Sequence, residues 1–233
     1  MTQIDGTRAL VVGATGALGT LIAERLAERG ARLALQGRDA SRLAESPGAV
    51  ETIAIDLTDE TAPEEIVERA REALGGLDLI VLAAGVVGFD TAEETGPQDL
   101  ETLFTVNALA PMRIISASVP ALRGSAADGR GPVVLALTGI VAELPTAGLA
   151  SYSASKAALA AYLTAAGREL RRTGIRLLDA HPGHIETGLA DRPLFGVAPR
   201  FPQGHDPAAV ADRLVRAIED DETSLPPAAF SGT

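Results

Sequence analysis

Short apolar runs and amphipathic segments alternate along almost the whole chain. Residues 8–12 form the first apolar run, and residues 17–29 follow with apolar side chains at helical spacing and Glu and Arg on the other side. Gly30 then occupies a position typical of a helix C-cap. A strand followed by an amphipathic helix, repeated along a chain, builds βαβ units with parallel strands. The pattern therefore predicts an α/β protein.

Six strands are predicted, with a weaker seventh candidate at residues 225–230. The strands are expected at residues 8–12, 31–36, 50–55, 77–84, 132–137 and 175–180. Helices are expected at residues 17–29, 39–45, 97–122, 151–172 and 207–219, with another opening at Thr58 and a kink in the long one at Pro111. Because crossovers are right-handed, we predict a doubly wound parallel sheet, a single Rossmann-type domain over residues 1–233 with helices on both faces.

Composition narrows the class of protein. A hydrophobic fraction of 46% is ample for a core, and an aromatic fraction of 3% means that Ala, Val, Leu and Ile must fill it. The net charge of −11 argues against nucleic-acid and anionic-membrane partners. The sequence shows neither a signal-peptide pattern nor a run of about 18 apolar residues, so we expect a soluble cytoplasmic protein.

Metal and thiol chemistry is not expected. The chain has no cysteine, which excludes disulfides, thiol nucleophiles and cysteine-based zinc sites. Its three histidines, His181, His184 and His205, are too dispersed for a familiar metal-ligand spacing. We therefore predict no metal site.

A glycine-rich segment joins the first predicted strand to the first predicted helix. It reads Gly13-Ala14-Thr15-Gly16-Ala17-Leu18-Gly19. Glycines here let the backbone turn tightly and let a pyrophosphate approach the start of the helix. The strand before the segment and the amphipathic helix after it are the context that this mechanism requires, so we predict a dinucleotide-binding loop. The alternative is a glycine-rich turn without a ligand.

The end of the second predicted strand indicates which dinucleotide is preferred. An acidic residue there binds the ribose 2′-hydroxyl of NAD, whereas an arginine accommodates the 2′-phosphate of NADP. Gly37 stands in the place of the acid, and Arg38 follows it. We therefore predict NADP(H), with NAD(H) as the alternative. The acidic Asp39 comes next and argues for NAD unless it serves as the N-cap of the following helix.

Tyr152 and Lys156 are the candidate acid–base pair. Lys156 is the only lysine in the chain, beside 19 arginines, which suggests a position where arginine cannot serve. On a helix, a spacing of four places the two side chains on one face. A nearby ammonium favours the phenolate, so we expect a lowered pKa for Tyr152 and proton exchange near neutral pH. Taken alone, the spacing is also compatible with chance.

Residues 188–204 form a long, proline-punctuated segment between the sixth strand and the last helix. A loop of this length in a compact domain is often a binding loop, and we predict a substrate lid, with a disordered surface loop as the alternative. Further substrate walls are expected from residues 86–89 and 140–149 and from the lid around Leu194 and Phe195. Arg192 and Arg200 are candidates for carboxylate binding, although arginines are more often solvated at the surface.

Glycine loop, alternating elements and Tyr-x-x-x-Lys spacing together resemble the short-chain dehydrogenase/reductase family. The resemblance extends from Thr7 to Glu219, and the run Tyr152-Ser153-Ala154-Ser155-Lys156 matches the start of the family's catalytic helix. Three further motifs occur in family order: Asp56-Leu57, Asn107 within Thr105-Val106-Asn107-Ala108, and His181-Pro182-Gly183-His184-Ile185-Glu186-Thr187.

The resemblance implies a role for each motif. Tyr152 would exchange the proton, Lys156 would lower its pKa and bind the nicotinamide ribose, and Asn107 would hold a relay water. The implied cofactor-binding set is Gly13, Thr15, Gly16, Ala17, Leu18, Gly19, Arg38, Asp56, Leu57, Ala84, Gly85, Tyr152, Lys156, Pro182, Gly183, Ile185 and Thr187. Within it, Asp56 and Leu57 would contact adenine. Ile185 and Thr187 would contact the nicotinamide carboxamide. Relatives pair two long helices across a two-fold axis, so a homodimer or homotetramer is expected.

Several positions depart from the family pattern. Gly139 stands where the family has its catalytic serine, and the adjacent Thr138 could supply a hydroxyl if the chain distorts at Gly139. Leu82-Ala83-Ala84-Gly85 replaces the family's Asn-Asn-Ala-Gly. The glycine spacing is that of the extended members of the family, although this chain is short and lacks the customary final strand.

These features predict an NADP(H)-dependent oxidoreductase that interconverts a carbonyl and an alcohol, with Tyr152, Lys156, Asn107 and Thr138 as the catalytic set. The substrate is expected to be an apolar or uncharged small molecule. Two alternatives stay open. Gly139 favours a cofactor-binding sensor or structural subunit without oxidoreductase activity, and the glycine spacing favours an epimerase or dehydratase of the same fold.

Overall fold

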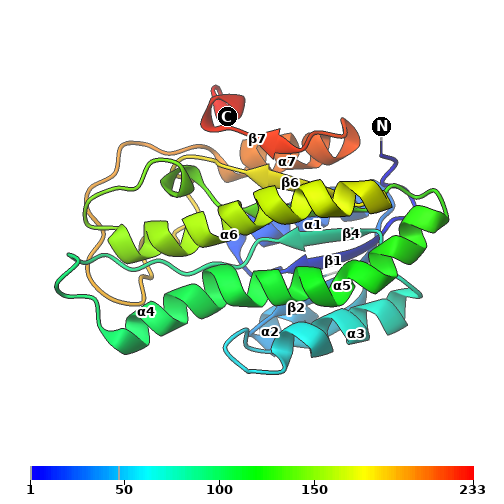
Figure 1. Ribbon diagram of the computed structural model, residues 1–233, viewed down its shortest axis with the longest axis horizontal. Coiled ribbons are helices and arrows are strands. Elements are labelled where there is room, and N and C mark those ends of the chain that lie inside the picture. Colours follow the sequence, from blue (N-terminus) through cyan, green and yellow to red (C-terminus); the bar gives the residue numbers. More distant parts are fainter. Residues whose placement is uncertain (1, 47) are drawn as a thin grey trace.

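A parallel sheet of seven strands forms the centre of the computed structural model, which describes residues 2–46 and 48–233 (Figure 1). The strands follow the order β3-β2-β1-β4-β5-β6-β7, so the chain reverses its direction across the sheet between β1 and β4. This is the doubly wound topology that the alternation of apolar runs and amphipathic segments predicts.

The elements lie close to their predicted positions. The strands are β1 (Arg8–Val12), β2 (Arg32–Gly37), β3 (Ala49–Ala54), β4 (Leu79–Leu82), β5 (Val133–Leu137), β6 (Arg176–Ala180) and β7 (Ser224–Leu225). The α-helices are α1 (Ala17–Glu28), α2 (Ala40–Ala44), α3 (Ala62–Leu74), α4 (Pro97–Phe104), α5 (Ala110–Ala127), α6 (Ala150–Leu170) and α7 (Pro207–Glu219). Short helical turns are η1 (Thr105–Leu109), η2 (Ile140–Ala142), η3 (Arg171–Thr173) and η4 (Pro227–Phe230).

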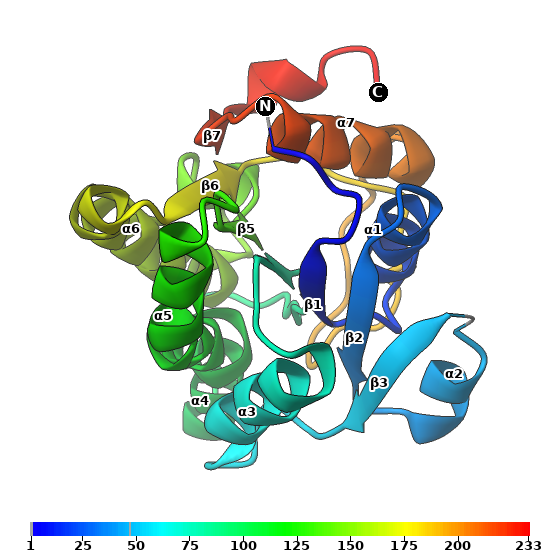
Figure 2. The ribbon, with the colours of Figure 1, turned by 90° about the vertical axis from the view of Figure 1, so that its right-hand side faces the viewer.

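Both faces of the sheet are buried, because successive side chains of a strand enter different helical layers. In β1, Leu10 and Val12 pack in the layer that contains α3, α5 and α6, whereas Ala9 and Val11 pack in the layer that contains α1 and α7. Figure 2 shows these helices on the two sides of the twisted sheet. The continuous apolar runs of the strands follow from this double burial.

The predicted helix at residues 97–122 is a longer helical stretch with one irregularity. α4 is followed by the π-helical turn η1, and α5 then runs on to Ala127. Pro111 lies at the start of α5, and because proline has no N–H it cannot bond the carbonyl of Asn107 four residues earlier. The π-helical turn η1 therefore lies just before the predicted kink at Pro111. Turns of this kind frequently occur at functional sites.

The stretch Pro97–Ala127 also meets the length and composition of a membrane-spanning helix, with a mean hydropathy of 1.2 in its most apolar window. The sequence analysis did not recognise this property. Half of that window is buried inside the fold, where α5 packs against α3. Core helices of globular proteins share these properties, so the stretch is weak support for a membrane span.

The candidate for a seventh strand, residues 225–230, is a strand only at its start. β7 pairs in parallel with β6 through Asp179 with Ser224 and Ala180 with Leu225. The chain then turns into η4, which buries Phe230 against the α1 and α7 layer. The sheet therefore has seven strands, the upper end of the predicted range.

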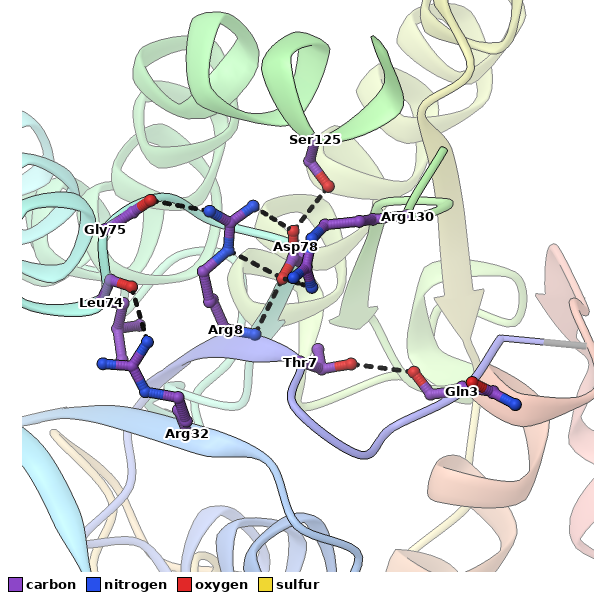
Figure 3. Close-up of polar contacts among 9 residues, drawn as sticks. All are labelled: Gln3, Thr7, Arg8, Arg32, Leu74, Gly75, Asp78, Ser125 and Arg130. Atoms are coloured by element: carbon purple, nitrogen blue, oxygen red, sulfur yellow. Dashed lines mark hydrogen bonds and ion pairs between the residues drawn. The ribbon is translucent and has the colours of Figure 1, made fainter. Parts of the chain in front are cut away.

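A buried carboxylate joins the amino-terminal ends of the central strands, at the end of the sheet opposite the glycine loop (Figure 3). Asp78 is 4% exposed and accepts hydrogen bonds of 2.6 to 3.0 Å from the guanidinium and backbone N–H of Arg8. It also accepts bonds from Ser125 at 2.7 Å and Arg130 at 3.2 Å. These partners offset the cost of burying the charge and fix β1 to the turn before β4 and to α5.

Candidate active site

The carboxyl ends of the central strands meet at one edge of the sheet, and the segments that follow them enclose a cleft of about 560 Å³. Every residue of the predicted catalytic and cofactor-binding sets lines this cleft except Asn107. Asn107 lies behind its wall and is 1% exposed. The fold thus gathers at one place residues that are separated by most of the chain.

Two positions of the glycine loop have no room for a side chain. A Cβ on Gly13, whose φ is +84°, would lie 2.5 Å from the backbone N of Ala84. A Cβ on Gly19 would overlap the carbonyl oxygen of Gly13. The loop leads into α1, whose N-cap is Gly16, so the first N–H groups of the helix lack a side-chain acceptor. Such groups bind phosphate, and the loop therefore fits the pyrophosphate of a dinucleotide.

Gln36 fixes this loop from the end of β2. Its side chain is buried, accepts a hydrogen bond from the N–H of Gly13 at 3.0 Å and donates one to the carbonyl of Ile55 at 2.7 Å. One amide thus ties the chain beyond β1 to the chain beyond β3. Gln36 is not among the predicted site residues, although a single amide after the apolar residues Leu33, Ala34 and Leu35 was a usable signal.

The side chain of Arg38 places a positive charge at the border of the cleft, just beyond β2. Gly37 packs so closely on Thr15 that a Cβ would lie 2.7 Å from the threonine side chain. Asp39 accepts hydrogen bonds from two N–H groups of α2 and is the N-cap of that helix, one of its two predicted roles. Arg38 lines the cleft, is 70% exposed and lies 3.9 Å from Asp56.

Tyr152 and Lys156 lie in the first turns of α6 and both line the cleft, as their spacing predicts. The ammonium of Lys156 donates a hydrogen bond of 2.8 Å to the carbonyl of Leu137 at the end of β5. Gly85 leaves space beside it, since a Cβ there would lie 3.4 Å from Nζ. Burial lowers the pKa of Lys156 to about 8, although the charge of Asp179 raises it.

The predicted lowering of the Tyr152 pKa is wrong for this structure. Burial raises the pKa of Tyr152 to about 12, because a phenolate in the enclosed site would lose its hydration. The prediction considered the charge of Lys156 and not the enclosure of the hydroxyl. At neutral pH Tyr152 is therefore a neutral phenol able to donate a proton, and Lys156 carries its charge.

Asn107 joins three elements at the back of the cleft. Its carboxamide accepts a hydrogen bond from the N–H of Val86 and donates to the carbonyl of the same residue, both at 2.9 Å. It also donates to the hydroxyl of Ser155 at 3.0 Å. The π-helical turn η1 thus positions Asn107 between the segment after β4 and α6. The role of Asn107 in holding a relay water stays a prediction. Its hydrogen bond with Ser155 was not predicted.

The chain does distort at Gly139, where φ is +79°, and the N–H groups of Thr138 and Gly139 both donate to the carbonyl of Ala180. The hydroxyl of Thr138 is fully buried and donates to the carboxylate of Asp179 at 2.6 Å. Its proton is therefore held by Asp179, which argues against Thr138 as the replacement for the missing serine.

The predicted lid segment, residues 188–204, packs on the wall of the cleft. The N–H of Phe89 donates to the carbonyl of Phe195 at 3.1 Å. A Cβ on Gly88 would overlap the ring of Phe195, and a Cβ on Gly196 would overlap the carbonyl of Phe89. The segment therefore meets the chain after β4 at two points where only glycine fits.

An apolar cluster forms the substrate side of the cleft around Tyr152. Its members are Val87, Phe89, Val141, Leu149, Leu189, Ala190, Ala198 and Phe201. Phe201 stacks on His184, with ring centroids 4.7 Å apart. The predicted wall residues Leu194 and Phe195 do not line the cleft, and Phe201 from the same segment does. Of the two candidate arginines, Arg192 lines the cleft and Arg200 does not.

Two further polar residues behind the cleft were not predicted. Asp179 and His181 form a hydrogen-bonded group with Thr138 at the ends of β5 and β6. The available signal was Asp179 itself, a carboxylate beside the apolar residues Leu177, Leu178 and Ala180. Asp179 follows Thr138 by 41 residues and His181 follows it by 43, so only the pairing of the two strands brings these residues together.

Comparisons with known proteins agree with this geometry. The profile of the short chain dehydrogenase family matches residues 7–193. An uncharacterised oxidoreductase of Staphylococcus saprophyticus is 29% identical over 227 residues, covering 94% of both chains. The ketoacyl reductase HetN of Nostoc is 28% identical, covering 97% of this chain and 79% of its own length. A short chain dehydrogenase from Burkholderia cenocepacia in complex with NADP has a TM-score of 0.81 at 26% identity, covering 98% of this chain and 92% of that one.

The profile match covers most of the chain, from β1 to the start of the lid segment. Among solved structures with this fold, one from Burkholderia cenocepacia is in complex with NADP and one from Brucella melitensis is complexed with NADH. The glycine loop and the carboxyl ends of the strands lie where doubly wound proteins bind dinucleotides, and Tyr152 and Lys156 line the same cleft. The chain belongs to the short-chain dehydrogenase/reductase family of oxidoreductases.

Proposed function

We propose that the protein reduces a carbonyl compound with NADPH and that Tyr152 donates the proton. The observation that carries the proposal is the position of the half-buried Tyr152 and the buried Lys156 in the same cleft as the glycine loop. When bound, the cofactor supplies a hydride to the carbonyl carbon. The oxygen that gains charge takes the phenolic proton of Tyr152.

The protonation states support reduction rather than oxidation. With its pKa raised to about 12, Tyr152 holds its proton until the developing alkoxide takes it. Lys156 is charged at neutral pH and stabilises the phenolate that remains. General acid catalysis of this kind contributes about 10²–10⁴-fold to the rate. The absence of a side chain at Gly139 removes one contact to the oxyanion, which elsewhere costs roughly 10²–10³-fold.

The preference for NADPH rests on the charge at the end of β2. Arg38 borders the cleft, and Asp39 is engaged as a helix cap instead of facing a ribose. Arg42 of α2 also lines the cleft and adds a second cation. A phosphate contact from a charged donor contributes roughly 1.5–3 kcal/mol, or about 10–100-fold in affinity. Arg38→Ala should lower the NADPH-over-NADH ratio of kcat/KM by that factor, and Arg123→Ala on the exposed side of α5 should not.

The apolar cluster around Tyr152 supports an apolar or uncharged carbonyl substrate. Most side chains on the substrate side have no charge, and Arg192 is the exception that could meet an anionic group. We propose that residues 188–204 close over the substrate as a lid, because they pack on residues 88 and 89 beside this cluster. HetN, a ketoacyl reductase by name, is consistent with a carbonyl substrate for this chain.

The test compares NADPH and NADH in the presence of a panel of apolar and charged carbonyl compounds. Consumption of NADPH with an apolar carbonyl is the expected result. Tyr152→Phe should then lose about 10²–10⁴-fold in kcat while the affinity for NADPH stays the same. Full turnover of Tyr152→Phe would overturn the assigned role of the tyrosine.

A homodimer or homotetramer is also proposed, by analogy with relatives that pair their long helices. Leu100 of α4 and Leu109 of η1 are 41% and 51% exposed on this helical stretch and would be covered by a partner. Light scattering measures the state directly, and a monomer would contradict the proposal.

A second candidate function is cofactor binding without turnover, and the contacts of Thr138 favour it. Neither Gly139 nor the Asp179-bound Thr138 offers a hydroxyl to a substrate. NADPH binding with no turnover over the whole carbonyl and alcohol panel would support this candidate. Tyr152, Lys156 and Asn107 argue for the reductase, since a protein that only binds the cofactor needs no proton donor.

A further inference from the structure

A chain of polar side chains lies behind the cleft at the ends of β5 and β6. The hydroxyl of Thr138 donates to one carboxylate oxygen of Asp179 at 2.6 Å, and His181 Nε2 lies 3.2 Å from the other. On its far side, His181 Nδ1 lies 3.3 Å from the carboxylate of Glu143. The side chains of His181 and Asp179 are 8% and 13% exposed, whereas the side chain of Glu143 is 45% exposed. The chain therefore runs from the interior to solvent.

One peptide unit separates this group from Lys156. The carbonyl of Leu137 accepts the hydrogen bond from the Lys156 ammonium, and the next residue, Thr138, bonds Asp179 through its hydroxyl. Lys156 on α6 and Asp179 on β6 thus approach the end of β5 from two elements. Opposite charges interact strongly in a site of low dielectric constant. Asp179 is the carboxylate whose charge acts on Lys156 in the described part of the chain.

We propose that Asp179 is a positioning residue for the reaction. It keeps the ammonium of Lys156 charged in its buried site, and His181 and Glu143 hold the Asp179 carboxylate in place. The effect of Asp179 on the reaction rests on the proposed function, because that function defines the reaction in which Lys156 takes part. The interaction between the two charges exists whether or not a substrate is turned over.

The surroundings of His181 fit this role. Asp179 of β6 and Glu143 after η2 are the charged groups in contact with its ring, and Thr138 and the backbone of Gly139 adjoin it from the end of β5. β7 contributes the carbonyl of Leu225, which accepts the backbone N–H of His181. Burial alone would lower the pKa of His181, but the hydrogen bond with Asp179 and the two carboxylate charges outweigh it, and the pKa is raised. His181 therefore lies between the carboxylates of Asp179 and Glu143 and holds the Asp179 side chain from the side opposite Thr138.

The single lysine permits a direct test without turnover. Protein grown with lysine carrying ¹³C at Cε gives one side-chain NMR signal, that of Lys156. Its titration is followed in the wild type, Asp179→Asn, Asp179→Glu and the control Asp59→Asn, which removes an equal charge from an exposed site. Asp179→Asn should lower the pKa of Lys156 by about 0.5 to 1 unit or more. Asp179→Glu should restore it, and Asp59→Asn should leave it unchanged.

A structural role alone would not move this titration. An unchanged Lys156 titration in folded Asp179→Asn overturns the inference, whatever the enzyme does with NADPH. If Asp179→Asn does not fold, Glu143→Gln serves instead, because Glu143 is half-exposed and its charge raises the pKa of His181. The midpoint of the His181 NMR titration should then move to lower pH. An unchanged midpoint overturns the proposal that Glu143, His181 and Asp179 act together.

Kinetics separates this inference from the proposed function. If the enzyme reduces a carbonyl, the plot of kcat against pH should contain a limb that reports the titration of Lys156. In Asp179→Asn this limb should move to lower pH by as much as the Lys156 pKa measured by NMR, with KM unchanged. A profile that stays in place also overturns the inference. Failure of the wild type to oxidise NADPH with any carbonyl would count against the proposed function, while the NMR result would stand.

Discussion

The ammonium of Lys156 donates a hydrogen bond of 2.8 Å to the carbonyl oxygen of Leu137. This contact holds a charge in a site where the residue is only 6% exposed. Burying an ammonium lowers its pKa and costs stability as long as the group is charged. The catalytic lysine is therefore expected to destabilise the fold that positions it.

Lys156→Met should make the protein more stable and abolish turnover. The pKa of Lys156 falls from 10.5 to about 8 on folding, so the cost of its charge is fully present below pH 8 and is relieved as the pH rises to 10.5. After the lost hydrogen bond is counted, we expect a gain of roughly 2 kcal/mol at neutral pH. Urea unfolding at neutral and alkaline pH measures both effects. A variant less stable than the wild type at neutral pH would show that the charge is well solvated.

Gly139→Ser should not restore the missing catalytic contact. There is space for the side chain, since the nearest atom to a Cβ would be the carbonyl oxygen of Pro182 at 3.7 Å. The obstacle is the backbone, because a φ of +79° is unfavourable for any residue with a Cβ, by about 1–2 kcal/mol. Gly139→Ser and Gly139→Ala should therefore lose the same stability, with no gain in kcat. A tenfold gain for the serine variant alone would contradict this.

Gly88→Ala should weaken substrate binding by displacing the lid. The added methyl group would overlap the ring of Phe195, which packs against Gly88 from residues 188–204. We expect KM to rise roughly tenfold with a smaller change in kcat, because a lid of the kind proposed would hold the substrate and exclude water. Gly88→Ala combined with Phe195→Ala should recover part of the loss. Gly124→Ala, where a Cβ meets nothing, is the control.

Asp78→Asn should destabilise the protein by about 3 kcal/mol, because it leaves Arg8 without its buried partner. Burial would raise the pKa of Asp78, but the hydrogen bonds from Arg8 and Ser125 outweigh it, and the pKa is lowered below 3.8. The contribution of ionised Asp78 to the free energy of unfolding is thus complete above the pKa that the group has in the unfolded chain. It is lost as the pH falls through the pKa that the group has in the folded protein. Urea midpoints of the wild type should decline below pH 4 more steeply than those of the variant.

Asp90→Asn should stabilise the protein. Within residues 2–46 and 48–233, both carboxylate oxygens of Asp90 are shielded from water and have no hydrogen-bond partner. An unpaired buried charge costs more than a neutral amide, and we expect a gain of about 1 kcal/mol or more. The thermal midpoint should rise, whereas the exposed Asp59→Asn, with the same change in net charge, should leave it unchanged. An equal midpoint for wild type and Asp90→Asn would indicate a partner outside this chain.

Local patterns predicted the fold well, because strand, glycine loop and helix follow one another in the sequence, and the residues predicted to bind the cofactor line one cleft. The spacing of Tyr152 and Lys156 likewise fixed their common face on α6. The predicted direction of the Tyr152 pKa was wrong, because the burial of its hydroxyl depends on the apolar cluster around it. The members of that cluster come from segments far apart in the sequence. Thr138 was proposed as a catalytic hydroxyl because it adjoins Gly139, and its hydrogen bond to Asp179 was not foreseen because only the sheet brings the two strands together.

A lysine that occurs once also decides how this protein can be handled chemically. Reagents that acylate or cross-link primary amines have a single side-chain target here, and it lies within the cleft next to Tyr152. Coupling chemistry aimed at surface lysines will find none, whereas the many exposed carboxylates offer an alternative. Slow acylation of Lys156 by a small activated ester, prevented by a molecule that fills the cleft, would therefore report whether the cleft is occupied, with no need for a known substrate.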